Sequence, residues 1–114
     1  TTTFFKARHG EDDTTFFAYV TADDLAQSTA YQNLTNYSGS GADRSSSGTL
    51  WLFGPSSTTY VKHFYSRVNS YSGTNYSFDC FSAGYFNTTS AIDAIDFDMT
   101  TGSFDAIIKM YGLL

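Results

Sequence analysis

Apolar and polar positions alternate along most of this chain, and the alternation predicts strands. The runs Thr3–Arg8 and Thr15–Thr21 are rich in aromatic residues and flank a polar loop from His9 to Asp13, an arrangement typical of a hairpin. The apolar run Thr49–Phe53 ends at Gly54-Pro55, because proline cannot donate a backbone hydrogen bond to a sheet. No stretch longer than about ten residues shows the 3.6-residue period of a helix.

The longest predicted strands are Tyr60–Asn69 and Tyr76–Phe86, which should pair antiparallel across the turn Ser70–Asn75. Side chains two residues apart share a face of a strand. The second strand therefore has one face with Phe78, Cys80, Ser82, Gly84 and Phe86, and another with Asp79, Phe81, Ala83 and Tyr85. Neither face is purely polar, so we expect something else to cover the sheet.

The clearest hairpin of the sequence lies near the C-terminus. Ile95, Phe97 and Met99 alternate with acidic residues, and after the turn Thr100–Ser103 the segment Ala106–Tyr111 alternates again.

The middle of the chain is less regular. Asp23–Ala30 is predicted to form one helical turn capped by Asp23 or Asp24, Tyr31–Tyr37 a strand, and Ser38–Gly48 an exposed flexible loop.

These elements predict an all-β fold: an antiparallel β-sandwich of jelly-roll or related topology, with seven or eight short strands. The 114 residues fit a single domain, residues 1–114, with one core. The chain opens on strand-like sequence at Thr1 without Met, so we expect the natural chain to be longer, trimmed or only partly given, and a preceding segment to supply further strands.

Composition narrows the function classes. Aromatic residues make up 18% of the chain and charged residues 15%, which argues against disorder. Polarity comes from small hydroxyls, and the net charge of −5 argues against a nucleic-acid partner.

Cys80 is the single cysteine of the sequence, so no intrachain disulfide is expected, although an intermolecular disulfide stays open. No apolar run approaches the ~18 residues that span a bilayer, so membrane insertion is not expected.

Two clusters of acidic and histidine residues are candidates for a catalytic or metal site. Asp93, Asp96, Asp98 and Asp105 lie on the predicted final hairpin, but their spacing matches no calcium loop, and a solvated face opposite Lys109 explains them better. His9, Glu11, Asp12 and Asp13 suit a polar hairpin tip better than an acid-base pair, and His63 suits a packed or inter-subunit position.

No nucleophile elbow, Cys-His framework or phosphate loop occurs. The sequence therefore predicts a protein that is not an enzyme, with no catalytic residue, cofactor or metal.

Aromatic and amide side chains offer a binding hypothesis. Tyr31, Tyr37, Tyr71, Tyr76 and Trp51 would supply platforms for sugar rings, with Asn33, Asn36, Asn75 and Asp43 as hydrogen-bonding partners. The same aromatics also suit a β-sandwich core or a subunit interface. Trp51, Tyr71, Tyr76, Asn75 and Asp43 are the candidate ligand or interface residues.

Three stretches carry a family resemblance: Ser47–Phe64, Ala83–Phe97 and the closing Phe104–Leu113, which ends on Tyr-Gly and an aliphatic residue. They resemble a group of small structural virion proteins of tailed phages from marine and freshwater bacteria. The opening up to Gln32 is similar to the middle portion of that group, whereas Leu34–Ser46 has no counterpart. The shared motifs mark a strand framework and carry no catalytic residue.

The resemblance implies a part of a virion, such as a tail-fibre, baseplate or capsid-surface module, located in the virion and bound to other virion proteins. We expect a non-enzymatic structural protein that assembles through its β-faces as a homo-oligomer, most readily a trimer. The alternative is a carbohydrate-binding adhesin that recognises host surface polysaccharide through loops at one end of the sandwich.

Overall fold

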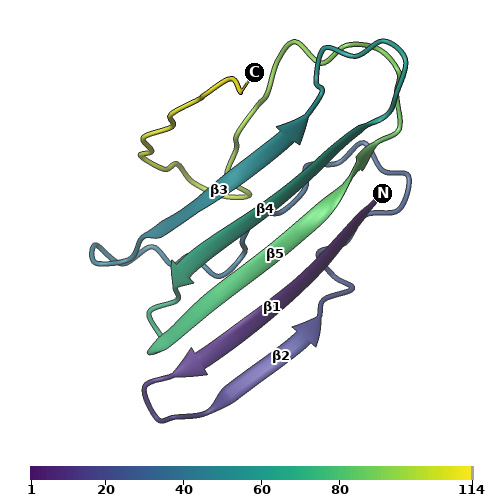
Figure 1. Ribbon diagram of the computed structural model, residues 1–114. Coiled ribbons are helices and arrows are strands. Elements are labelled where there is room, and N and C mark those ends of the chain that lie inside the picture. Colours follow the sequence, from purple (N-terminus) through teal and green to yellow (C-terminus); the bar gives the residue numbers. More distant parts are fainter. Residues whose placement is uncertain (114) are drawn as a thin grey trace.

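The computed structural model describes residues 1–113 and contains one antiparallel sheet of five strands (Figure 1). The strands are β1 (Thr2–Gly10), β2 (Thr15–Tyr19), β3 (Ser46–Phe53), β4 (Lys62–Tyr71) and β5 (Tyr76–Phe86), in the spatial order β2-β1-β5-β4-β3. The all-β, antiparallel class is confirmed. Over residues 1–113 the structure has five strands in one sheet, so neither the predicted number of seven or eight nor the second layer of a sandwich is found there.

Two predicted hairpins are confirmed. β4 and β5 pair antiparallel with Val68 opposite Cys80, and β1 and β2 pair with Phe5 opposite Tyr19. The β4–β5 turn places Asn75 and Gly73 in the left-handed region, with φ of 62° and 74°, and asparagine and glycine are the residues that adopt it most easily. β1 then pairs with β5 along its whole length, which joins the two hairpins into one sheet.

One face of the sheet is covered by irregular chain, and we call it the covered face. In Figure 1 residues 20–45 pass behind the strands. Tyr37 from this segment stacks on Phe78 at 4.2 Å between ring centroids. The backbone N–H of Leu25 donates to Thr2 Oγ1, and the Thr2 backbone N–H donates to the Leu25 carbonyl. Phe4, Phe78 and Cys80 form the centre of this core.

Serines and a lysine are buried on the covered face beside these aromatics. Ser66 and Ser82 lie opposite each other on β4 and β5, with their hydroxyls 2.6 Å apart. The Lys62 ammonium, on a residue only 1% exposed, donates to the carbonyls of Thr88 and Ser90. Each polar group therefore has a partner, as burial requires.

The predicted helical turn Asp23–Ala30 and the predicted strand Tyr31–Tyr37 are wrong. Neither segment is helix or strand in the structure. The reason is a local side-chain network: the buried carboxylate of Asp23 accepts hydrogen bonds from the amides of Asn33 and Asn36. Such side-chain bonds compete with regular secondary structure.

The predicted loop Ser38–Gly48 is shorter at its C-terminal end, because β3 begins at Ser46. The Ser46 hydroxyl lies 2.8 Å from that of Ser70, its partner on β4. At Gly48 an added Cβ would lie 2.5 Å from the Arg67 carbonyl oxygen, so the absence of a side chain lets the two strands lie this close.

The predicted C-terminal hairpin is also wrong, because neither Ile95–Met99 nor Ala106–Tyr111 is a strand in the structure. The chain nevertheless bends between them at Thr100–Gly102, with Gly102 at φ 75°. Alternation predicts an extended backbone but does not provide a neighbour to pair with. Over the described part of the chain, no helix has the length and hydropathy to cross a bilayer.

Candidate functional site

The opposite side of the sheet, which we call the open face, is the strongest candidate for a functional surface. Its side chains alternate with those of the covered face along every strand. In β4, for example, His63, Tyr65, Arg67 and Asn69 are exposed, whereas the residues between them are buried. Nine aromatic residues belong to it: Phe5, Phe17, Tyr19, Trp51, Phe53, Tyr65, Tyr71, Phe81 and Tyr85.

The aromatic rings of the open face contact one another across strands. On the β3 side, Tyr65 packs against Trp51 and Phe53, with centroid distances of 6.1 and 5.3 Å. Towards β2, Phe5 stacks on Phe81 at 5.0 Å and meets the edge of Phe17 at 5.7 Å. The strands thus hold a broad aromatic surface, and its rings stay partly in solvent: Tyr65 is 47% exposed and Phe17 70%.

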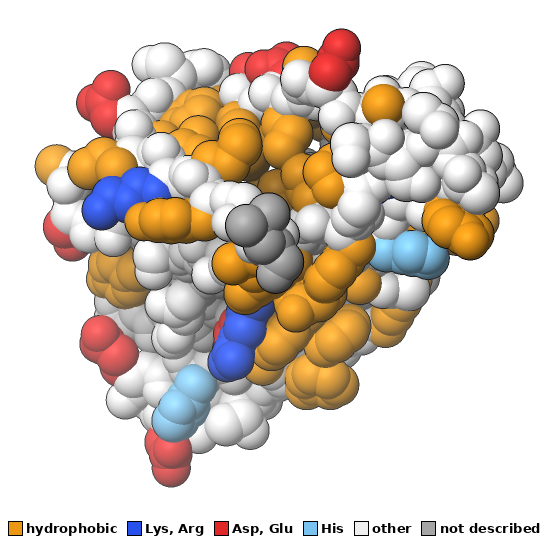
Figure 2. All heavy atoms as spheres, turned by 45° about the horizontal axis from the view of Figure 1, so that its top comes forward, with side chains coloured by type: hydrophobic (Ala, Val, Ile, Leu, Met, Phe, Trp, Pro, Cys, Tyr) orange, Lys and Arg blue, Asp and Glu red, His pale blue; other side chains and the backbone are white. Residues whose placement is uncertain are grey.

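Figure 2 shows hydrophobic side chains gathered in a broad patch, with the Asp and Glu side chains mostly towards the outline of the view. Asp79 is the one acidic residue within the five strands. It accepts a bidentate hydrogen bond from the Arg67 guanidinium, which also lies over the Phe81 ring. Asp79 raises the pKa of Arg67 further, through this hydrogen bond first and through its charge second. The open face therefore carries a charge pair and little net charge.

A hollow opens at the aromatic end of this face, between β3 and the start of β1. Its cavity volume is ≈ 330 Å³. Ala83 and Gly84 form part of its lining, and the rings of His63, Tyr65 and Tyr85 stand beside them. Small residues between aromatic walls leave room for an apolar or planar group of a partner.

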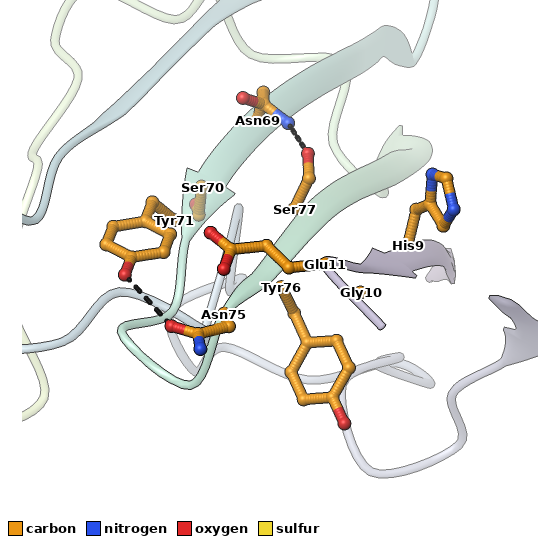
Figure 3. A pocket seen from close by; sticks show the side chains of 9 residues that line it. All are labelled: His9, Gly10, Glu11, Asn69, Ser70, Tyr71, Asn75, Tyr76 and Ser77. Atoms are coloured by element: carbon orange, nitrogen blue, oxygen red, sulfur yellow. Dashed lines mark hydrogen bonds between the residues drawn. The ribbon is translucent and has the colours of Figure 1, made fainter. Parts of the chain in front are cut away.

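A second hollow, of ≈ 320 Å³, lies at the polar end of the open face (Figure 3). Tyr71, Asn75 and Tyr76 line it together with Glu11, and the Tyr71 hydroxyl donates to Asn75 Oδ1 at 3.4 Å. The figure also shows Asn69 bonded to Ser77 at the rim of the hollow.

Three of the five candidate residues, Tyr71, Asn75 and Tyr76, therefore line one hollow, but the Tyr76 ring points away from the other two (Figure 3) and packs against Phe78 on the covered face. Trp51 lies elsewhere on the open face: it pairs with Tyr65, six residues along β4 from Tyr71, or about 20 Å away. Asp43 is in the loop before β3, beside Gly41 and Arg44, and is not part of either hollow.

The acidic and histidine residues weighed for catalysis have local structural partners. His9 Nε2 lies 3.0 Å from Asp13 Oδ1 in the β1–β2 turn, where both side chains are exposed. Hydrogen bonds from the Thr14 side chain and backbone lower the pKa of Asp12. Asp96 accepts a hydrogen bond from the Tyr31 hydroxyl, which raises the Tyr31 pKa. Among residues 1–113, no three His, Cys, Asp or Glu side chains are arranged to hold a metal ion.

Cys80 lies in the core of the covered face. Burial is the main cause that raises the pKa of its thiol, so the reactive thiolate is disfavoured. Its Sγ atom donates a weak hydrogen bond to the Thr35 hydroxyl at 3.8 Å.

Sequence reasoning missed most of the open face as a candidate, including Phe5, Tyr65, Phe81 and Tyr85. One signal was available: β5 carries aromatic residues on both of its faces. What the sequence lacked was the register that aligns these rings across five strands.

Comparison with known proteins adds no relative: no protein-family model, curated protein or solved structure matches the chain.

Proposed function

We propose that this protein is a non-enzymatic structural component of a phage virion, and that it assembles by burying its open face against the open face of a second copy. The observation that carries the proposal is the one-sided sheet. Irregular chain covers the face that holds buried serines, whereas the face with nine aromatic residues has no cover within residues 1–113. The virion location rests on the sequence resemblance alone.

Area supports a second copy as the occupant. Five strands spaced about 4.8 Å apart, with about eight residues each, give a face of about 24 by 27 Å, or about 650 Å². Two such faces would bury about 1,300 Å² in total, within the range of specific protein interfaces. Packing two sheets in this way would also create the predicted sandwich, with one layer from each copy.

Charge supports the same occupant. The chain carries a net charge of −5, but the ion pair Arg67–Asp79 leaves the open face nearly neutral. Two copies can therefore meet on this face without the repulsion that other surfaces would cause.

The test is the mass of the protein in solution, measured by light scattering at tens of micromolar. The unmodified chain should be a homo-oligomer, and Tyr65→Asp, which places a charge on the open face, should dissociate this contact. Tyr60→Asp is the matched control, because Tyr60 is 73% exposed but lies outside the strands. A monomeric unmodified chain, or equal effects of the two variants, would contradict the proposal.

The virion role is tested separately by the position of the protein in purified particles. Reconstruction of the particle should place it in a fibre, baseplate or capsid surface, and its absence from particles would remove this part of the proposal.

A second candidate function is carbohydrate binding by the open face. Trp51 is 41% exposed and lies beside Tyr65 and Phe53, so three rings of one cluster are available to stack on sugar rings. Calorimetry with host surface polysaccharide should then show binding that Trp51→Ala abolishes and Tyr60→Ala preserves. If a monomeric variant, whose open face is free, does not bind the polysaccharide, carbohydrate binding is rejected and the structural role remains the only proposal.

A further inference from the structure

The C-terminal segment, residues 104–113, lies along the molecule without a partner. Figure 1 shows it running beyond the β3 side of the sheet. Several of its apolar side chains are strongly exposed: Ile107 is 89% exposed and Met110 77%. An apolar segment left in water in this way can be covered by pairing with the edge of a sheet.

The backbone of this region is equally unpaired. Over the described residues, no backbone–backbone hydrogen bond involves residues 93–113. The side chains nevertheless keep the period of a strand, with Ala106, Ile108 and Met110 in one row and Ile107, Lys109 and Tyr111 in the other. Each N–H and C=O of the segment is free to enter a ladder.

The sheet offers a matching edge at β3. This strand has eight residues, Ser46–Phe53, and none of them is charged or proline. Charged residues, proline and bulges are the usual protection of an edge strand, and β3 has no such residue. The other edge, β2, has only five residues, which is too short for a segment of this length.

The chain that leads into the segment is held near the β3 edge of its own sheet at Ile92. The Ile92 backbone N–H donates to the carbonyl of Pro55, two residues after the end of β3. Ten residues then separate Ile92 from Ser103, so the segment has the length to reach its own edge, yet it does not pair there. The edge and the segment are therefore both available to another molecule.

We infer that residues 104–113 of one copy add as a sixth strand to the β3 edge of a second copy. This inference goes beyond the proposed function, since it concerns the edge of the sheet and not its open face. Each copy donates one strand and accepts one, so the contact is head-to-tail and closes into a ring when the rotation allows it. A ring of three copies would be the trimer expected from the sequence. Pairing of open faces alone joins two copies and does not produce a trimer.

The first test compares the oligomeric state of two double-proline variants, one within residues 104–113 and one upstream of them. Ile107→Pro/Ile108→Pro removes two consecutive backbone donors, so it blocks pairing whichever residue faces the neighbouring strand. Ala94→Pro/Ile95→Pro is the matched control upstream of the segment. Light scattering in the Tyr65→Asp background, where the open face is disabled, should show oligomers for the control and monomers for Ile107→Pro/Ile108→Pro.

Equal masses for the two proline variants would overturn the inference. A monomeric Tyr65→Asp chain without any proline would overturn it as well. Neither result bears on the open face, because that contact is read from the Tyr65→Asp and Tyr60→Asp comparison in the otherwise unmodified chain.

The second test identifies the acceptor. A synthetic peptide of residues 103–113 with a photo-crosslinker at position 107 is mixed with the Ile107→Pro/Ile108→Pro chain, whose own segment cannot compete. Mass spectrometry should find the label in β3, and a peptide with prolines at 107 and 108 should give none. Labelling in β2, or label from both peptides alike, would contradict the assignment to β3.

Discussion

Both faces of the sheet carry aromatic side chains, but only the covered face buries them, as Phe4, Phe64 and Phe78 show. The covered face buries Ser66, Ser70 and Ser82, and the open face exposes Trp51 and Phe53. Both faces alternate along the same strands, so strand propensity does not distinguish them. The difference lies in what covers each side.

Irregular chain can cover a sheet only if its polar backbone and side chains find partners. The hydroxyls of the covered face provide them: Ser70 contacts the hydroxyls of both Thr35 and Ser46. The open face has few such groups at its aromatic end, so a second apolar surface suits it better than a polar loop. Buried hydroxyls therefore mark the side of this sheet that its own chain covers.

The largest expected difference in the free energy of unfolding is between alanine variants of two phenylalanines of β5. Phe78 is 5% exposed and packs between Tyr37 and Tyr76, so Phe78→Ala should lower the free energy of unfolding by about 3–5 kcal/mol. Phe81→Ala, on the half-buried open side, should lower it by only about 1 kcal/mol in dilute solution. Urea denaturation followed by fluorescence measures both. A larger cost for Phe81→Ala would show that the open face is the true core.

Glycines test the same distinction between sheet and loop. At Gly84 an added Cβ would lie 2.5 Å from the Thr1 carbonyl oxygen, so Gly84→Val should overpack this site and cost about 1–3 kcal/mol. At Gly41 the nearest atom, 2.8 Å away, is Nε of the flexible Arg44 side chain, so Gly41→Val should cost less. Thermal melts of the two variants should keep this order, and the reverse order would place the rigid region in the loop.

A third prediction concerns the buried hydroxyl pair of the covered face. Ser82→Ala should leave the Ser66 hydroxyl without its 2.6 Å partner and cost about 1–3 kcal/mol. Removing both hydroxyls in Ser66→Ala/Ser82→Ala should cost less than the sum of the single changes. A double-mutant cycle in urea measures this coupling, and strict additivity would mean that the two hydroxyls do not interact.

The smallest effect is expected for the ion pair of the open face. Arg67 is well exposed, so water screens its contact with Asp79, and Asp79→Asn should cost about 0.2–1 kcal/mol in the monomer. The difference should shrink further in high salt. A cost that exceeds this range and persists in salt would show that the pair is already shielded by a partner.

Local pattern sufficed for the parts of the fold that pair with a neighbour in sequence. β5 has the bounds Tyr76–Phe86 that alternation and flanking turn residues predict. Its partner is displaced from the predicted Tyr60–Asn69 to Lys62–Tyr71, so only Ser72–Asn75 of the predicted turn lies between the two strands. β1 pairing with β5 was beyond such reasoning, because it joins residues 66 to 82 positions apart and leaves no local signal.

The candidate site was predicted only in part for the same reason. Tyr71, Asn75 and Tyr76 line one hollow because they lie at the same turn. Trp51 lies opposite Tyr65 only because of the register between β3 and β4. The prediction of a strand at Tyr31–Tyr37 is wrong for another reason. Its asparagines bind Asp23, a side-chain contact that an alternation of residue types does not reveal.

The pairing of β1 with β5 also governs the order in which the molecule folds. The hairpins β1–β2 and β4–β5 close over short loops and can form early, but β1 must wait for the last strand before its second edge is paired. During synthesis the aromatic N-terminal hairpin is therefore exposed until residue 86 has left the ribosome. Chains that stop within β5 should accumulate as aggregation-prone species, whereas chains that end just after Phe86 already contain every strand of the sheet.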